Sequence, residues 1–126
     1  MKFQPDTALG VNTISRLDPG RIVVGATPFA HSIIVPWAGE VLRWDVERFE
    51  QLAAAHIEAL LALQPELVIL GSGRRLRFAA PALVRALIDR RIGYEAMDTA
   101  AAARTYNVLA GERRKVVAAL ILEPAE

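Results

Sequence analysis

The first third of the chain alternates short apolar runs with turn residues, a pattern typical of antiparallel strands. One pair of β-favouring runs flanks the tripeptide Asp18-Pro19-Gly20, and a second pair flanks Pro36-Trp37-Ala38-Gly39. Proline presets φ and glycine accepts a positive φ, so each turn predicts a hairpin. The expected strands cover residues 11–17, 21–24, 32–35 and 40–44.

From residue 45 onward, helical and strand patterns alternate. Asp45 is expected to cap an amphipathic helix that ends before Pro65 and carries His56 on its apolar face. The apolar run at residues 67–70 predicts a buried central strand. Another helix is expected from Pro81, closed by Gly93, and another over residues 100–110, with strands over residues 94–97 and 115–122.

Strands that alternate with helices imply crossover connections and a sheet that is parallel at least in part. The predicted fold class is therefore α/β, with a mixed central β-sheet and flanking helices. The N-terminal antiparallel hairpins either add strands to that sheet or form a second small layer. The length of 126 residues and the absence of a linker predict a single domain over residues 1–126.

Composition removes several classes of chemistry. With 53% hydrophobic and 23% charged residues, the chain has enough apolar surface to fold. It has no cysteine, which excludes disulfides, thiolate nucleophiles and sulfur-ligated zinc. His31 and His56 are its only histidines, so no metal site and no cofactor are predicted. Without a long apolar run or signal-peptide features, it is expected to be soluble and cytoplasmic.

The net charge does not indicate a class of binding partner. The chain has 15 Lys and Arg against 14 Asp and Glu, and all the cations except Lys2 and Lys115 are arginine. Residues 74–104 contain seven arginines and three acids, but no aromatic interleaving or nucleic-acid motif accompanies them. Nucleic acid is therefore not expected as a partner.

The loop Gly71-Ser72-Gly73 directly follows the predicted central strand. Glycines there would let backbone N–H groups approach an anion, and Arg74, Arg75 and Arg77 would add cationic donors. The spacing matches neither GxGxxG nor GxxxxGKS, and it is not the GxSxG of a nucleophile elbow. The alternative is a glycine turn with solvated arginines, and both interpretations stay open.

A second polar stretch begins at Asp98 and Thr99, which are expected to cap the last helix. On that helix Arg104 and Asn107 share a face, where they could hold a ligand carboxylate or a partner's backbone. Alternatively, Arg104 pairs with a local carboxylate and fixes the helix, which is the favoured interpretation. His56 is expected to be a hydrogen-bonded core residue.

These residues carry a resemblance to a known family. The Gly71-Ser72-Gly73 loop, followed by Glu95 to Thr99 and by the string Arg-Thr-Tyr-Asn-Val-Leu at residues 104–109, resembles the Mth938-like domain family. The resemblance covers nearly the whole chain and implies a three-layer α/β domain. Its bacterial and archaeal members are mostly uncharacterised, and a mitochondrial relative is an assembly factor for respiratory complex I.

The family's motif falls on Gly71 to Gly73 and on Asp98, Thr99 and residues 104–107 of this chain. Two positions depart from it. Ser72 stands where threonine is common and keeps the hydroxyl, whereas Ala103 stands where cysteine is frequent and removes any thiol chemistry.

Two functional hypotheses follow. The leading one is a non-catalytic binding or assembly module with a protein partner, because no titratable groups are clustered at catalytic spacing. The other is a site for a small anionic ligand, enzymatic or regulatory, between the Gly71–Gly73 loop and the 98–107 segment. The candidate binding residues are Gly71, Ser72, Gly73, Arg74, Asp98, Thr99, Arg104, Tyr106 and Asn107, and no catalytic residue is assigned.

Overall fold

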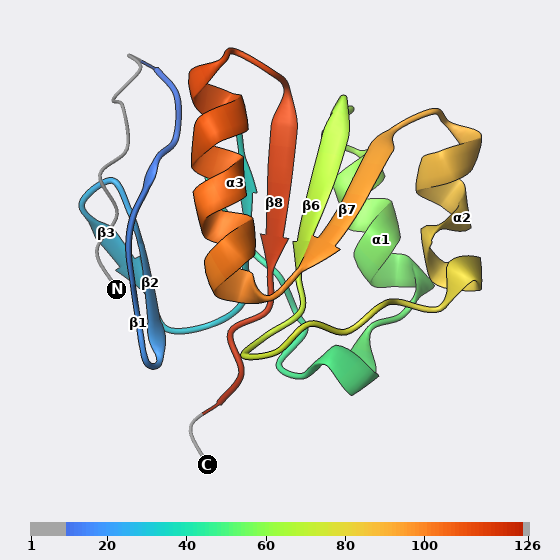
Figure 1. Ribbon diagram of the computed structural model, residues 1–126, viewed down its shortest axis with the longest axis horizontal. Coiled ribbons are helices and arrows are strands. Elements are labelled where there is room, and N and C mark those ends of the chain that lie inside the picture. The colour runs from blue at the N-terminus through green and yellow to red at the C-terminus, as the bar shows by residue number, and fades with distance from the viewer. Residues whose placement is uncertain (1–9, 125–126) are drawn as a thin grey trace.

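The computed structural model describes residues 10–124, which form two β-sheets and three α-helices (Figure 1). The first sheet has the order β1-β2-β3, with strands β1 (Ile14–Asp18), β2 (Arg21–Val24) and β3 (Thr27–Phe29). The second has the order β5-β4-β8-β6-β7, with strands β4 (Ile33–Pro36), β5 (Leu42–Arg43), β6 (Leu67–Gly71), β7 (Gly93–Met97) and β8 (Val116–Leu120). The helices are α1 (Ala54–Leu61), α2 (Pro81–Asp89) and α3 (Thr99–Gly111).

The five-stranded sheet is mixed, as the sequence predicts. Strand β6 pairs in parallel with β7 and with β8, whereas β4 pairs antiparallel with both β8 and β5. The first hairpin, around Asp18-Pro19-Gly20, forms the separate small sheet with β3, a strand that the sequence analysis did not identify. The second hairpin joins the central sheet. Both ways of placing the N-terminal hairpins therefore occur in the same molecule.

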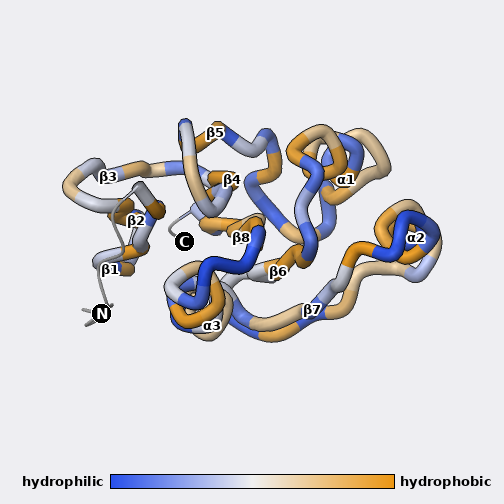
Figure 2. The backbone as a smooth tube through the Cα atoms, turned by 90° about the horizontal axis from the view of Figure 1, so that it is seen from above, coloured by the Kyte–Doolittle hydropathy of each residue, from blue (hydrophilic) through white to orange (hydrophobic). Residues whose placement is uncertain are grey.

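The central sheet is buried on both faces because its strands send alternate side chains to opposite sides. Leu67 and Ile69 of β6 face the core that contains α3 and the small sheet, whereas Val68 and Leu70 face the core formed with α1 and α2. Strands β4 and β8 divide their residues in the same way. Seen from above, α3 covers one face and α1 and α2 lie beyond the other (Figure 2). The three-layer α/β fold is thus confirmed.

The predicted start of the first helix at Asp45 is wrong, because α1 starts at Ala54. A short 3-10 helix, Phe49–Gln51, precedes it. The cause is the His56 ring: its Nδ1 accepts the Ala53 N–H at 2.9 Å, which stops the helix from extending backward. Its Nε2 then donates to the Asp45 carbonyl at 2.9 Å. A histidine within the helix therefore caps it, and Asp45 does not.

Gly93 also differs from expectation, since it opens β7 instead of closing α2. The helix ends at Asp89, and the chain then turns through Arg91, whose φ is +58°. A Cβ at Gly93 would lie 2.8 Å from Leu67 Cδ1 on the neighbouring strand, so the Leu67 side chain would have to shift. The glycine thus serves close packing between strands.

Candidate functional site

The glycine loop is pressed against the start of α3. Strand β6 ends at Gly71, where a Cβ would lie 2.9 Å from Leu120 Cδ2 and 3.0 Å from the backbone Cα of Thr99. That crowding explains the glycine, because a larger residue would push the loop away from the helix. Gly73 is needed for a different reason: its φ is +105°, a conformation that residues with a side chain rarely adopt.

The backbone N–H groups of this loop are already paired. Ser72 N–H donates to the Met97 carbonyl at 2.8 Å, and Gly73 N–H donates to Thr99 Oγ1 at 2.9 Å. Arg74 N–H donates to a carboxylate oxygen of Glu123 at 2.6 Å. The anion that this loop holds is therefore the chain's own Glu123, and the loop offers no free cradle of N–H groups to a phosphate.

Ser72 is buried beneath the loop, and its hydroxyl shapes the backbone. The oxygen lies 2.8 Å from the Arg75 carbonyl and 3.0 Å from the Met97 carbonyl, to which it can donate. It also accepts the Arg77 N–H at 3.0 Å. A serine nucleophile needs an accessible oxygen, whereas Ser72 is 0% exposed. The arrangement therefore assigns Ser72 to loop geometry.

Thr99 ties three distant segments together. Its hydroxyl accepts the Gly73 N–H and donates to the Ile121 carbonyl at 2.7 Å, while its own N–H donates to the Gly73 carbonyl at 2.8 Å. Asp98 caps α3 as the sequence predicts, with its carboxylate accepting the Ala101 N–H at 2.8 Å. The space expected between the Gly71–Gly73 loop and the 98–107 segment is thus bridged by the protein's own hydrogen bonds.

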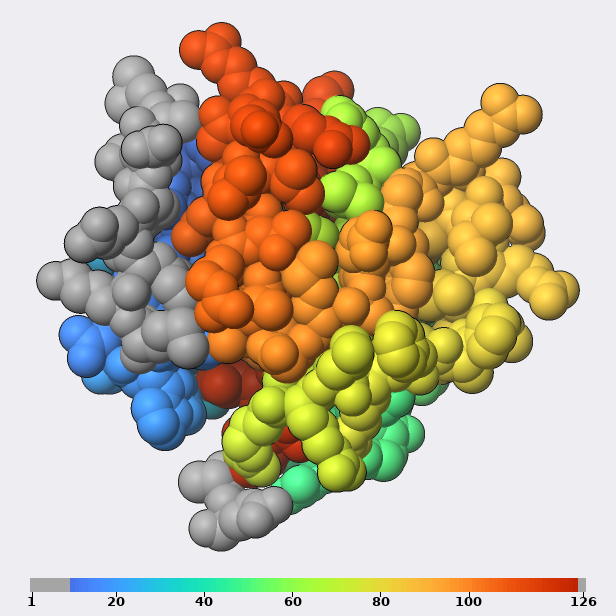
Figure 3. Space-filling model, in the orientation of Figure 1, coloured from blue at the N-terminus to red at the C-terminus, as the bar shows by residue number. Residues whose placement is uncertain are grey.

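A cavity of about 530 Å³ lies beside this bridge. Figure 3 shows it as a hollow between the β1–β2 hairpin tip in blue, the glycine loop in yellow-green and the segment after β8 in red. It is lined by residues 17–20, Gly73, Arg74, residues 98–100 and residues 121–123. Leu17, Pro19 and Leu122 make it partly apolar. Its charged groups include Asp18, whose pKa the hydrogen bond from Arg16 holds below its ordinary value.

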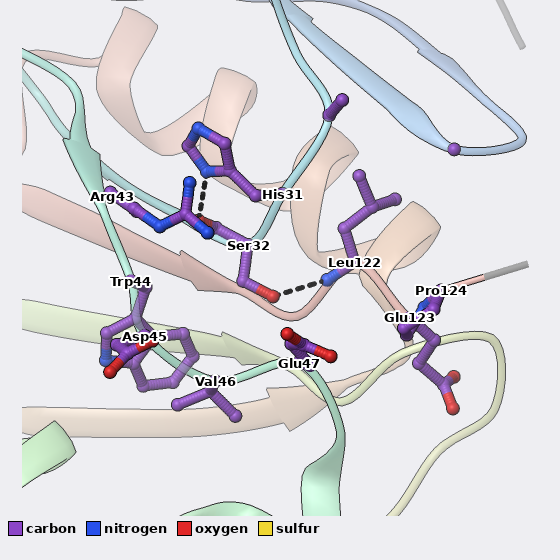
Figure 4. Close-up of a pocket in the computed structure, with 12 residues that line it drawn as sticks. His31, Ser32, Arg43, Trp44, Asp45, Val46, Glu47, Leu122, Glu123 and Pro124 are labelled. Atoms are coloured by element: carbon purple, nitrogen blue, oxygen red, sulfur yellow. Dashed lines mark hydrogen bonds between the residues drawn. The ribbon is translucent and has the colours of Figure 1, made fainter.

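A second cavity, of about 350 Å³, adjoins the first. Gly20, Leu122 and Glu123 line both. Figure 4 shows its polar side chains, with His31 and Arg43 on one side and Glu47 and Glu123 toward the other. Ser32 Oγ accepts the Leu122 N–H at 2.9 Å and so holds the segment that separates the two spaces.

Three of the predicted binding residues lie away from both cavities. Tyr106 is 0% exposed, its hydroxyl lies 2.9 Å from the Asn12 carbonyl and 3.0 Å from the Pro36 carbonyl, and burial raises its pKa. Asn107 clamps the backbone of Ile14, accepting its N–H and donating to its carbonyl, each at 2.8 Å. Arg104 is exposed on α3. Asn107 therefore joins α3 to β1 of the small sheet, and Tyr106 joins α3 to Asn12 and to the end of β4.

The predicted residues thus fall into three places. Gly73, Arg74, Asp98 and Thr99 line the larger cavity, Gly71 and Ser72 set the path of the loop beneath it, and Arg104, Tyr106 and Asn107 lie elsewhere on α3. The sequence analysis missed Glu123 and the hairpin tip as cavity residues. No local pattern marks them, because the contact between Arg74 and Glu123 spans 49 positions.

Residues 10–124 also show how the chain stands with respect to metal ions and membranes. In that range no group of three or more His, Asp or Glu side chains is placed to hold a metal ion. No helix in the same range is long and apolar enough to cross a bilayer.

Comparison with known proteins gives a consistent picture. A family model described as "Protein of unknown function (DUF498/DUF598)" matches residues 14–121. A crystal structure from Bordetella parapertussis superposes with a TM-score of 0.86 at 39% identity, over 93% of this chain and 100% of that one. A solution structure from Bordetella pertussis, described as a Mth938-like domain, gives 0.85 at 33% identity, over 100% and 95%.

Curated relatives include a protein from Danio rerio named NADH dehydrogenase (ubiquinone) 1 alpha subcomplex assembly factor 3. The two are 30% identical over 125 residues, which is 98% of this chain and 71% of the relative. The protein of the same name from Bos taurus is 30% identical over 97% of this chain and 66% of its own length. About a third of each relative therefore has no counterpart here.

Proposed function

The chain belongs to the DUF498/DUF598 family of proteins of unknown function, and from this membership we propose that it is a non-catalytic module that assists the assembly of a protein complex. One observation carries the proposal: the similarity to a curated assembly factor extends over 98% of the chain. An assembly factor acts by binding protein subunits, so a protein partner is expected, and we place the module in the cytoplasm.

The geometry of the loop argues against a catalytic role for its residues. The hydroxyl of Ser72 and the N–H groups of Gly73 and Arg74 are used to hold the chain together. Catalytic groups, in contrast, must reach a substrate with an available proton, lone pair or N–H. Ser72, Gly73 and Arg74 thus hold segments of the chain together.

Deletion of the gene in the native host tests this proposal directly. Membrane and soluble complexes, separated on native gels and identified by mass spectrometry, should show a partly assembled complex that disappears when the wild-type chain is restored. A tagged chain should sediment with that partly assembled complex. Unchanged levels of every mature complex, together with a tagged chain that sediments only as free protein, would overturn the proposal.

The larger cavity supports a second candidate, a site for a small ligand. Its volume of about 530 Å³ falls within the range of small-molecule pockets, and it lies at the carboxyl ends of parallel strands, where α/β proteins commonly bind ligands. Arg74 would supply the charge for an anionic ligand, although its guanidinium already donates to the Pro124 carbonyl at 3.3 Å.

A thermal-shift screen of carboxylate and phosphate metabolites distinguishes this candidate. A compound that binds there should raise the Tm of the wild type in a concentration-dependent way and have less effect on Arg74→Ala. Arg90→Ala, at an exposed residue directly after α2 that lines neither cavity, is the matched control. If no compound separates these two variants, the ligand candidate is rejected and the assembly proposal is unaffected.

A further inference from the structure

The segment between the glycine loop and α2, residues 75–80, presents apolar side chains to solvent. Leu76 is 50% exposed and Phe78 is 74% exposed, whereas Arg77 and Ala79 between and after them are half-buried. Figure 3 shows this part of the chain at the surface in yellow-green. The 75–80 segment therefore has an outer side that carries Leu76 and Phe78 and an inner side that carries Arg77.

The inner side is firmly anchored. The Arg77 N–H donates to the buried Ser72 hydroxyl at 3.0 Å. Its guanidinium forms an ion pair with Glu50 and lies 5.8 Å from the centre of the Phe49 ring, close enough for a cation–π contact. The exposure of Leu76 and Phe78 is thus a fixed property of an ordered segment.

The same segment also has backbone groups and a charged side chain without partners among residues 10–124 of the protein. In the part of the chain that the structure describes, the backbone N–H and C=O groups of Leu76 and Phe78 make no hydrogen bond, unlike the N–H of Arg77. The exposed Arg75 side chain forms no ion pair there either. Two apolar side chains, unpaired backbone groups and a cation thus occur together.

We infer that the outer side of the 75–80 segment is the docking surface for an extended, acidic segment of a partner protein. This inference rests on the proposed assembly function and adds the surface and the chemistry of the partner. Backbone groups of the partner would pair with those of Leu76 and Phe78, as in strand addition. Its apolar side chains would cover Leu76 and Phe78, and a carboxylate would meet Arg75.

An anionic bilayer is a poorer match to the same surface. Burial in hydrocarbon would leave the N–H and C=O groups of Leu76 and Phe78 without partners, which lipid tails cannot supply. A peptide, in contrast, provides backbone donors and acceptors that can pair with these groups.

A random linear peptide library displayed on phage, panned against the folded chain, tests the inference. Selected sequences should alternate acidic with apolar residues. A synthetic peptide of the selected sequence should bind at least about tenfold more weakly to Phe78→Ser and to Leu76→Ser than to the wild type. Val108→Ser, which changes another exposed apolar residue on α3, should bind like the wild type.

The charge component is tested separately with Arg75→Gln, which should weaken binding, and Arg90→Gln, which should not. Backbone amide shifts on titration should be largest over residues 75–80. Selected peptides without acidic residues, or equal binding by Phe78→Ser and Val108→Ser, would overturn the inference. So would Phe78-dependent binding to vesicles of phosphatidylglycerol and phosphatidylethanolamine in place of peptide.

The outcome is separable from that of the assembly proposal. If Phe78→Ser restores complex assembly in the deletion strain as well as the wild type does, the docking surface is wrong while the assembly function stands. If the wild type itself restores nothing, the assembly function fails whatever the peptides show.

Discussion

Replacement of Thr99 by valine isolates the hydrogen bonds that hold the Gly71–Gly73 loop and Ile121 to the start of α3. Valine keeps the shape of the side chain but removes a hydroxyl that accepts the Gly73 N–H at 2.9 Å and donates to the Ile121 carbonyl at 2.7 Å. Thr99 is 5% exposed and Ile121 is 0% exposed, so water cannot readily replace the lost partner. Gly73 N–H and the Ile121 carbonyl would both be left unpaired.

The magnitude follows from those two groups. A buried polar group that loses its partner costs about 1–3 kcal/mol, so the loss of two partners in Thr99→Val should lower the free energy of unfolding by about 2–6 kcal/mol. Thr99→Ser is the matched control, because it keeps the hydroxyl and removes only a methyl group, worth about 1 kcal/mol. Thr99→Val should therefore be less stable than Thr99→Ser by about 1–5 kcal/mol, which is the cost of the lost hydroxyl less that of the lost methyl group.

Urea unfolding followed by circular dichroism gives both free energies, and an unchanged m-value would show that the unfolded states are comparable. Amide hydrogen exchange should also become faster at Gly73 in Thr99→Val. If Thr99→Val is within about 0.5 kcal/mol of Thr99→Ser, the hydroxyl does not hold the loop to the helix and the reasoning fails.

Three further expectations concern the same framework. Gly71→Ala should destabilise the fold by about 1–3 kcal/mol in thermal unfolding, because its Cβ would meet the Thr99 backbone at 3.0 Å; Gly111→Ala, where a Cβ meets nothing within 4 Å, is its control. Asn107→Ala should cost about 1–3 kcal/mol and speed amide exchange in β1, whereas Val108→Ala should do neither. Burial raises the pKa of Tyr106, so the neutral phenol contributes fully to the free energy of unfolding below about pH 10, and this contribution is lost as the pH rises further. Tyr106→Phe should remove this loss, which reduces the fall in the free energy of unfolding above pH 10 by about 1.4 kcal/mol per pH unit.

The sequence predicted elements well where neighbouring residues decide the outcome. The apolar run at residues 67–70 became the buried strand β6, and Asp98 caps α3 through Ala101, three positions along. It failed at Asp45, because the competing cap is the His56 ring. That ring donates to the Asp45 carbonyl, 11 positions away, and packs edge-on against the Trp44 ring. A pattern read along the chain does not contain such contacts.

The candidate site divides in the same way. Parallel strands end at one edge of a sheet, so the sequence could place Gly73 and Thr99 in one crevice, and the structure brings them together. It could not show that Glu123 occupies the loop, nor that Asn107 reaches back 93 positions to Ile14. These hydrogen bonds turn polar residues that look like a ligand site into links between segments.

By itself, then, the sequence determined the α/β class, the order of most strands and helices, and the residues that gather at the carboxyl edge of the central sheet. These follow from apolar periodicity, turn residues and caps, which act over a few positions. Tertiary structure alone decided which polar groups are satisfied internally and which face solvent, as at Ser72 and Phe78. Hydrogen-bond partners and exposure depend on segments that meet only after the chain has folded.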